Sequence, residues 1–195
     1  MGSDDADRWN QRYRDARTPQ DIDAPGIVHM VIASVRHGAR VLDVACGLGD
    51  AGLTLAQHGC DVTFVDVSPV ALQLVRDRAS NERLEVTTMA LDLSQDDPPH
   101  GPWDLITCVH YLDRNLLGRL SQYLAPGGRL VAAIATRRNL EQHARPSARF
   151  LLEEEELPGL VPALHILHHD EAWRANGVHE AWLIAAHREL GHEAA

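Results

Sequence analysis

Apolar residues in the middle of the chain gather in short continuous runs. The runs at 41–45, 61–67, 84–92, 103–112 and 129–136 are predicted to be strands, and the second is rich in β-branched residues. Strands that are apolar along nearly their whole length are typical of a parallel sheet with both faces covered. The pattern therefore predicts a buried parallel sheet, and the segments between the runs should cover it.

These intervening segments have helical patterns. One helix is predicted from Asp50 to His58 and another from about 69 to 79, with Ser68 as its N-cap. A third, 114–128, has a leucine-rich face and is expected to end at a Pro-Gly-Gly sequence. Because such helices join parallel strands by right-handed crossovers, the chain is predicted to be a doubly wound, Rossmann-like α/β domain with helices on both faces of the sheet.

The two ends of the chain depart from this alternation. Short helices are predicted at 7–16 and 24–38. Near the C-terminus, 163–173 and 178–190 are predicted to be strands joined by Arg174–Gly177, whose Asn-Gly pair favours a hairpin turn, and a helical piece at 151–157 precedes them. With this antiparallel hairpin, the mostly parallel sheet has seven strands.

Composition bounds the class of protein. Of the 195 residues 45% are apolar and 24% charged, close to the averages for soluble globular domains. No apolar run approaches the roughly 20 residues that cross a bilayer, and the acidic start is not a secretory signal. Cys46, Cys60 and Cys108 have unrelated spacings, which argues against a disulfide framework. We therefore expect a cytoplasmic protein that does not enter a membrane.

The formal net charge is -10, and the arginines are scattered rather than gathered on one stripe. Such a chain repels a phosphate backbone, so we expect no nucleic-acid partner. The sequence leaves the oligomeric state open.

A loop of small residues follows the first predicted strand. Ala45, Gly47 and Gly49 allow the backbone to approach a ligand closely, where ligands of open parallel sheets bind. Asp50, on the first turn of the next helix, would oppose a pyrophosphate. The loop therefore indicates a ligand other than a dinucleotide.

Five signals in order resemble the class I S-adenosylmethionine-dependent methyltransferases. They are Asp43 to Gly49, Asp66 before Val67-Ser68-Pro69, Asp92-Leu93, the strand containing Cys108, and the Leu124–Ile134 segment. The resemblance covers about 40–134, and the RWNQRY opening is similar to the small bacterial tellurite-resistance methyltransferases. Ala45 departs from the usual glycine at the first loop position.

The resemblance implies S-adenosylmethionine as cofactor, S-adenosylhomocysteine as product and a role for each matching residue. The loop of Ala45, Cys46, Gly47 and Gly49 would lie under the methionine moiety, with Asp43 near its amino group. Asp66, followed by Val67 and Ser68, would accept hydrogen bonds from the ribose hydroxyls. Asp92 and Leu93 would contact the adenine, and Cys108, Val109 and His110 would form the floor beside the sulfonium.

The residues themselves leave structural alternatives open. Asp43 can be a buried carboxylate that accepts backbone N–H groups, Asp66 a turn residue and Asp92 a solvated one. Cys46 can be a reactive thiol near a helix N-terminus or a small residue that fits the loop. Trp9 and Tyr13 can fold over the cofactor or pack on the sheet.

Histidines provide the remaining candidates. His110 and Tyr111 are weak candidates for a general base, since both follow the fourth strand, and each can instead form a pocket wall. His165, His168 and His169 lie close together in a predicted strand, but we expect a polar surface there and no metal.

We expect one domain, 1–195, in which 1–38 forms N-terminal helices or a lid, 39–136 the cofactor-binding core, and 137–195 the substrate-side segment and the hairpin. The expected reaction is in-line methyl transfer to a small-molecule acceptor. A non-catalytic S-adenosylmethionine-binding protein is the alternative. An NAD(P)-dependent oxidoreductase fits less well, because G-x-G-x-x-G is missing after the first strand. Asp66, at a strand end, is expected to be wet in the empty protein.

Overall fold

The structure of the protein is a computed structural model that describes residues 2–15 and 21–187. The chain forms two compact units, Met1–His100 and Gly101–Ala195. The single-domain organisation and its three subdivisions stay predictions.

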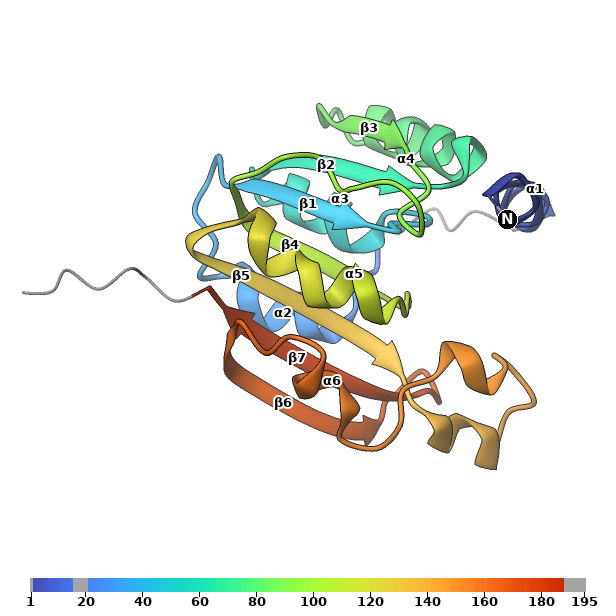
Figure 1. Ribbon diagram of the computed structural model, residues 1–195. Coiled ribbons are helices and arrows are strands. Elements are labelled where there is room, and N and C mark those ends of the chain that lie inside the picture. Colours follow the sequence, from blue (N-terminus) through green and yellow to red (C-terminus); the bar gives the residue numbers. More distant parts are fainter. Residues whose placement is uncertain (1, 16–20, 188–195) are drawn as a thin grey trace, which may run out of the picture. The chain divides into compact units, whose positions relative to one another are not determined.

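The first unit alternates helices with three parallel strands (Figure 1). In chain order, its elements are α1 (Gly2–Asp15), α2 (Gly26–Ile32), β1 (Arg40–Val44), α3 (Asp50–Gln57), β2 (Asp61–Asp66), α4 (Pro69–Asn81) and β3 (Thr87–Ala90). The strands lie in the order β3-β2-β1, α3 packs on β1 and β2, and α4 packs on β2 and β3. Ser68 caps α4 as predicted, its hydroxyl accepting from the Ala71 N–H.

Strand register brings the predicted motifs of this unit to one edge. Val44 pairs with Val65, and Asp66 pairs with Ala90. Cys46 continues the pairing, because its N–H donates to the Val65 carbonyl at 3.0 Å. The loops after β1, β2 and β3 therefore emerge side by side.

The core beneath these loops is closely packed around Phe64, which is fully buried. Gly52, in α3, lies directly against it: a Cβ at Gly52 would stand 2.3 Å from the Phe64 ring and 2.8 Å from the Asp43 carboxylate. A glycine at this position lets the helix backbone approach the sheet.

The second unit holds the other four strands. Its elements are β4 (Trp103–Val109), α5 (Arg114–Arg119), η1 (Leu120–Tyr123), β5 (Leu124–Ala135), η2 (Arg137–Glu141), η3 (Ala148–Phe150), α6 (Glu156–Gly159), β6 (His165–Trp173) and β7 (His179–Ala186). The order is β4-β5-β7-β6, with β4 parallel to β5 and the remaining pairs antiparallel. The hairpin between β6 and β7 turns at Arg174–Gly177, where the Arg174 N–H donates to the Val178 carbonyl.

The prediction of a helix over 114–128 is wrong in its second half. The helix ends at Arg119 and a 3-10 turn follows, after which Leu124 begins β5 and pairs with Trp103. Pairing with β4 satisfies backbone groups that a helix containing Pro126 leaves unbonded. The helix predicted at 151–157 is likewise displaced, to Glu156–Gly159.

The predicted fold class is confirmed. The seven strands make a mostly parallel sheet with an antiparallel C-terminal hairpin, accompanied by helices. In the part of the chain that the structure describes, no helix has the length and apolar character needed to cross a bilayer.

We predict that Gly52→Ala lowers the free energy of unfolding by about 1 to 3 kcal/mol, because the added methyl overpacks the Phe64 ring. Urea unfolding followed by circular dichroism measures the change. Gly159→Ala is the matched control, since a Cβ there meets no atom within 4 Å. Equal stability of the two variants would contradict the close packing of α3.

Candidate functional site

The loop after β1 is tightly coiled. Ala45, Gly47 and Gly49 have φ angles of 51°, 54° and 77°, all in the left-handed region. The Gly49 N–H donates to the Cys46 carbonyl at 2.8 Å and closes the turn. Ala45 adopts, at some conformational cost, the geometry that glycine takes freely. The loop thus presents backbone rather than side chains at the carboxyl end of β1.

Asp43 lies beneath this loop and is 2% exposed. Its Oδ2 accepts a hydrogen bond from the Gly52 N–H at 3.1 Å, in the first turn of α3. The carboxylate therefore joins the end of β1 to the start of the next helix. This contact agrees with the structural alternative for Asp43, and its role near an amino group stays a prediction.

Asp66 connects the loops after β1 and β2. Its Oδ2 accepts from the Gly47 N–H and its Oδ1 from the Ser68 N–H, each at 2.9 Å. The side chain is 5% exposed, so the expectation of a wet carboxylate is wrong. Burial raises the pKa of Asp66, although the backbone hydrogen bonds act in the opposite direction. Asp66 is buried because the loop after β1 folds back over the end of β2.

Helix α1 covers the same loop. A Cβ at Gly47 would lie 2.8 Å from the Tyr13 hydroxyl, and the Tyr13 ring stacks on Trp9 with 5.7 Å between centroids. Burial raises the pKa of Tyr13 strongly, and the nearby Asp66 carboxylate adds to the shift. Tyr13 thus lies over the loop and near Asp66, whereas Trp9 packs against Tyr13.

Asn10 makes a contact with Ser68 that the sequence did not reveal. Its Oδ1 accepts from the Ser68 hydroxyl at 2.7 Å, while that hydroxyl accepts from the Ala71 N–H at 3.2 Å. Helix α1 is therefore fastened to the N-terminus of α4. The RWNQRY opening contains Asn10, but nothing in its spacing indicates a partner 58 residues away.

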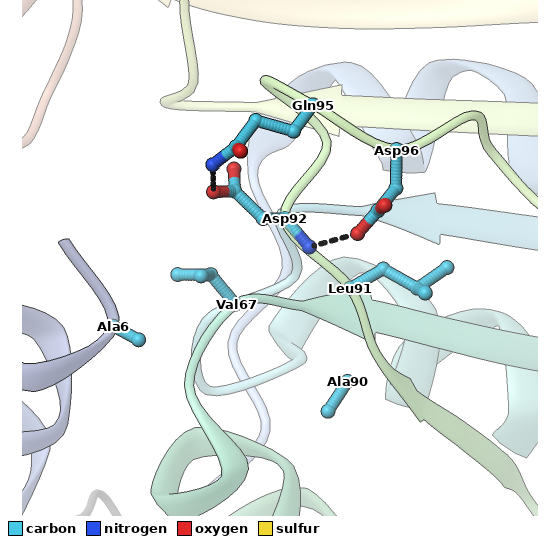
Figure 2. A pocket seen from close by; sticks show the side chains of 7 residues that line it. All are labelled: Ala6, Val67, Ala90, Leu91, Asp92, Gln95 and Asp96. Carbon is cyan, nitrogen blue, oxygen red and sulfur yellow. Dashed lines mark hydrogen bonds between the residues drawn. The ribbon is translucent and has the colours of Figure 1, made fainter. Parts of the chain in front are cut away.

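A pocket of about 280 Å³ opens beside the ends of β2 and β3 (Figure 2). It is lined by Ala6, Val67, Ala90, Leu91, Asp92, Gln95 and Asp96. Its wall combines small apolar side chains with carboxylates. A flat apolar ligand with a few polar atoms fits such a lining.

Asp92 is the most highly bonded residue of this pocket. Its carboxylate accepts from the Ser94 hydroxyl at 2.6 Å and from the Gln95 amide at 2.5 Å. The Ser94 hydrogen bond is the main cause that lowers the pKa of Asp92. Figure 2 also shows the Asp92 N–H donating to Asp96. The adjacent Leu93 side chain is 4% exposed and belongs to the core, while Leu91 lines the pocket.

Arg78, on α4, makes further contacts that the sequence did not reveal. Its guanidinium donates to the carbonyls of Leu48 and Asp21 and forms an ion pair with Asp50 at 2.7 Å. The side chain is 6% exposed. Arg78 thereby fixes the glycine loop from below and neutralises the carboxylate at the start of α3. The periodicity of α4 predicts an amphipathic helix but does not distinguish this arginine from solvated ones.

Cys46 has the properties of a structural residue. Burial raises the pKa of its thiol well above the usual value, and the Asp43 and Asp66 carboxylates raise it further. The thiolate required for nucleophilic chemistry is therefore disfavoured.

The remaining candidates lie in the second unit, at and after the end of β4. Cys108 is fully buried, with its thiol 3.4 Å from the Tyr111 carbonyl, and Val109 is half-buried. His110 has 53% of its side chain exposed, and its Nε2 lies 2.7 Å from Oε1 of Glu180 on β7. The sequence proposed His110 but missed Glu180, because no local signal links residues 70 positions apart.

Two histidines of β6 lie beside carboxylates. His168 lies 2.8 Å from Asp170, and His169 lies 3.6 Å from Glu155. A register shift between Ile166 and His168 interrupts the strand alternation there. Within 2–15 and 21–187, no group of three or more His, Cys, Asp or Glu side chains is arranged to hold a metal ion.

Comparison with known proteins agrees with this arrangement. Residues 41–128 match the family described as a methyltransferase domain. A mitochondrial ubiquinone biosynthesis O-methyltransferase from Schizosaccharomyces pombe is 33% identical over 110 residues, covering 51% of this chain and 39% of that protein. The methyltransferase GfsG from Streptomyces halstedii is 35% identical over 146 residues, covering 65% and 52%. The chain thus spans about half the length, or less, of these curated relatives.

Solved structures show the same fold at low sequence identity. TehB from Haemophilus influenzae superposes with a TM-score of 0.73 at 18% identity, covering 94% of this chain and 67% of that one. Magnesium protoporphyrin IX methyltransferase from Synechocystis, with bound S-adenosylmethionine, gives 0.71 at 19% identity, covering 95% and 96%. Residues 41–128 thus match a methyltransferase domain, and the chain has the same fold as these solved structures.

Proposed function

We propose that the protein transfers a methyl group from S-adenosylmethionine to a small-molecule acceptor and releases S-adenosylhomocysteine. The observation that carries the proposal is the buried Asp66 carboxylate, held between the glycine loop and the start of α4. It is supported by the methyltransferase-domain match and by relatives named as methyltransferases.

The hydrogen-bonding capacity of Asp66 suits a ribose. An ionised carboxylate has about four acceptor sites, and backbone N–H groups occupy one on each oxygen. Val67 donates a further backbone hydrogen bond to the carboxylate, and the acceptor capacity that remains suits the hydroxyls of a ribose. We therefore assign Asp66 to the ribose, with Val67 and Ser68 shaping the turn beside it.

The neighbouring pocket suits the adenine. Val67, Ala90 and Leu91 offer apolar surface to a flat ring, and the Asp92 or Asp96 carboxylate can accept from its exocyclic amine. Leu93 holds this loop from the core. The adenine contact proposed for Asp92 thus extends to residues that the sequence did not single out.

The methionine moiety is assigned to the coiled loop. Ala45, Cys46, Gly47 and Gly49 offer N–H groups and little bulk, and Asp43 supplies negative charge beneath them. Tyr13, stacked on Trp9, forms the lid over this moiety. Cys108, Val109 and His110 at the end of β4 complete the assignment as the floor beside the sulfonium.

Methyl transfer from a sulfonium needs little chemical activation by the protein. The sulfonium makes the methyl carbon electrophilic, so alignment of donor and acceptor and exclusion of water supply most of the catalysis. Our proposal places this protein in the cytoplasm and assigns it no nucleic-acid or membrane partner. The alternatives are a binding protein without turnover, which a methyl-transfer assay tests, and an NAD(P)-dependent oxidoreductase, which the first experiment tests.

We expect S-adenosylhomocysteine to raise the melting temperature while NAD and NADP do not. At a ligand concentration ~100 times the dissociation constant, the stabilisation is about 2.7 kcal/mol. Differential scanning fluorimetry measures the shift. A shift with NAD and none with S-adenosylhomocysteine would favour the oxidoreductase.

Asp66→Asn is expected to weaken S-adenosylhomocysteine binding at least about tenfold, because hydrogen bonds to a charged group contribute about 1.5 to 3 kcal/mol each. Asparagine retains one acceptor oxygen for the backbone, so the fold survives better than with alanine. Isothermal titration gives the affinity. Asp61→Asn, at the exposed start of β2, is the control. If both variants bind like the parent, Asp66 is a structural residue only.

The raised pKa of Asp66 predicts a pH dependence of binding. Ribose hydroxyls donate to the ionised carboxylate, so the affinity is full above that raised pKa and falls as the pH drops through it. The loss therefore begins at a higher pH than the usual value of 3.8 implies. Titrations between pH 7 and pH 4 with the parent and Asp66→Asn test this. A similar fall in the variant would assign the effect to another group.

A further inference from the structure

An imidazole and a carboxylate meet across the middle strand of the second unit. Strand β5 lies between β4 and β7, so residues on the outer two are about two strand spacings apart, roughly 9 to 10 Å. The His110 N–H donates to the Ala133 carbonyl, and Glu180 pairs with Ala135. Because alanines occupy β5 at both positions, the long side chains of His110 and Glu180 can reach one another above it.

The backbone of His110 assists this contact. Its φ of 57° lies in the left-handed region, whereas a regular strand would continue the alternation from Val109. Histidine enters this region more readily than most residues, though at some cost. The backbone turn directs the ring toward Glu180, and the 2.7 Å contact between Nε2 and Oε1 results.

Glu180 is itself held in place from the other side. Its Oε2 accepts from the Trp182 indole N–H at 2.7 Å, and the Arg174 guanidinium lies 3.7 Å above the Trp182 ring. Arg174 in turn pairs with Asp170 at 2.8 Å. A carboxylate that is 2% exposed and fixed by two donors leaves the imidazole little rotational freedom.

The charge of Glu180 selects the tautomer of His110. Burial acts to raise the pKa of Glu180, but hydrogen bonds from His110 and Trp182 and the charge of Arg174 lower it below the usual value. An ionised Glu180 accepts a proton donor, so Nε2 carries the hydrogen and Nδ1 keeps its lone pair. His110 is half exposed, and ligands of parallel sheets bind outside the carboxyl ends of strands such as β4.

We infer that His110 is the general base for an acceptor hydroxyl, with Glu180 as the positioning residue that fixes its tautomer and orientation. This rests on the proposed function and adds a substrate class to it: a phenol or alcohol. Acceptors that are already ionised at neutral pH, such as aromatic thiols, need no such base, so a held imidazole would bring them no gain.

The acceptor O–H proton moves to Nδ1 of His110, and an oxygen electron pair forms the new O–C bond to the methyl carbon. The S–C bond breaks with its electrons remaining on sulfur, which loses its positive charge. The proton on His110 then leaves to solvent, because the exposed ring is open to water.

The first test measures the imidazole directly and needs no acceptor. Nitrogen-15 NMR of histidine-labelled protein, with His110→Asn to assign the signal, is expected to show His110 as the Nε2–H tautomer at neutral pH. Asparagine is chosen because it tolerates a positive φ. Glu180→Gln should mix the tautomers of His110, while His165→Asn, on the exposed part of β6, should leave them unchanged. The Nδ1–H tautomer in the parent would overturn the inference.

The second test uses radiolabelled S-adenosylmethionine with two matched probes, benzene-1,2-diol and benzene-1,2-dithiol. With the diol, His110→Asn should lose about 10²- to 10⁴-fold in kcat, the usual contribution of general-base catalysis. Glu180→Gln should lower kcat by a smaller factor and shift the acid limb of the pH profile, with S-adenosylhomocysteine affinity unchanged. With the dithiol, Glu180→Gln should stay within a few-fold of the parent, and His110→Asn should lose much less activity than it loses with the diol.

The outcomes separate this inference from the proposed function. Loss of S-adenosylhomocysteine binding in the parent would overturn the proposed function. Intact binding with diol methylation that is insensitive to His110→Asn, or with transfer to the dithiol alone, would overturn the base assignment only. If neither probe is methylated, the NMR tautomer decides.

Discussion

Asp66 occupies the position on which the first unit's site depends. Backbone N–H groups from two loops converge on its carboxylate, so the loop after β1 and the entry to α4 have fixed positions relative to the end of β2. Burying that charge raises the pKa of Asp66, and the backbone donors only partly offset the effect. A ligand that donates further hydrogen bonds would add to the solvation of the carboxylate, and this gives the site a physical reason to bind polyhydroxyl groups.

Other groups support the same loop from different directions. Arg78 holds it from α4 through the Leu48 carbonyl and Asp50, and Tyr13 covers Gly47 from α1. The ion pair with Arg78 also gives Asp50 a structural role. That carboxylate opposes a phosphate, as the sequence indicates, but it is a structural partner of a buried cation as well.

In the second unit, side-chain size on one strand permits a polar contact between its neighbours. Alanine at 133 and 135 leaves space above β5, and the left-handed backbone at His110 directs the ring into it. Trp182 and Arg174 then fix the carboxylate that the ring contacts. In many histidine bases a carboxylate likewise bonds one ring nitrogen and so sets the tautomer.

The sequence by itself determined the alternation of strands and helices, the small-residue loop and the strand-end acids, because burial periodicity and turn chemistry are local properties. The prediction from the sequence was wrong for the segment from Leu124 to Gly128, where pairing with β4 outweighs helix propensity. It was also wrong for the hydration of Asp66, which depends on a loop folding back. Only the tertiary structure decided which partners Asn10, Arg78 and Glu180 contact. Their partners lie 58, 28 and 70 positions away, and only chain packing brings such residues within hydrogen-bond distance.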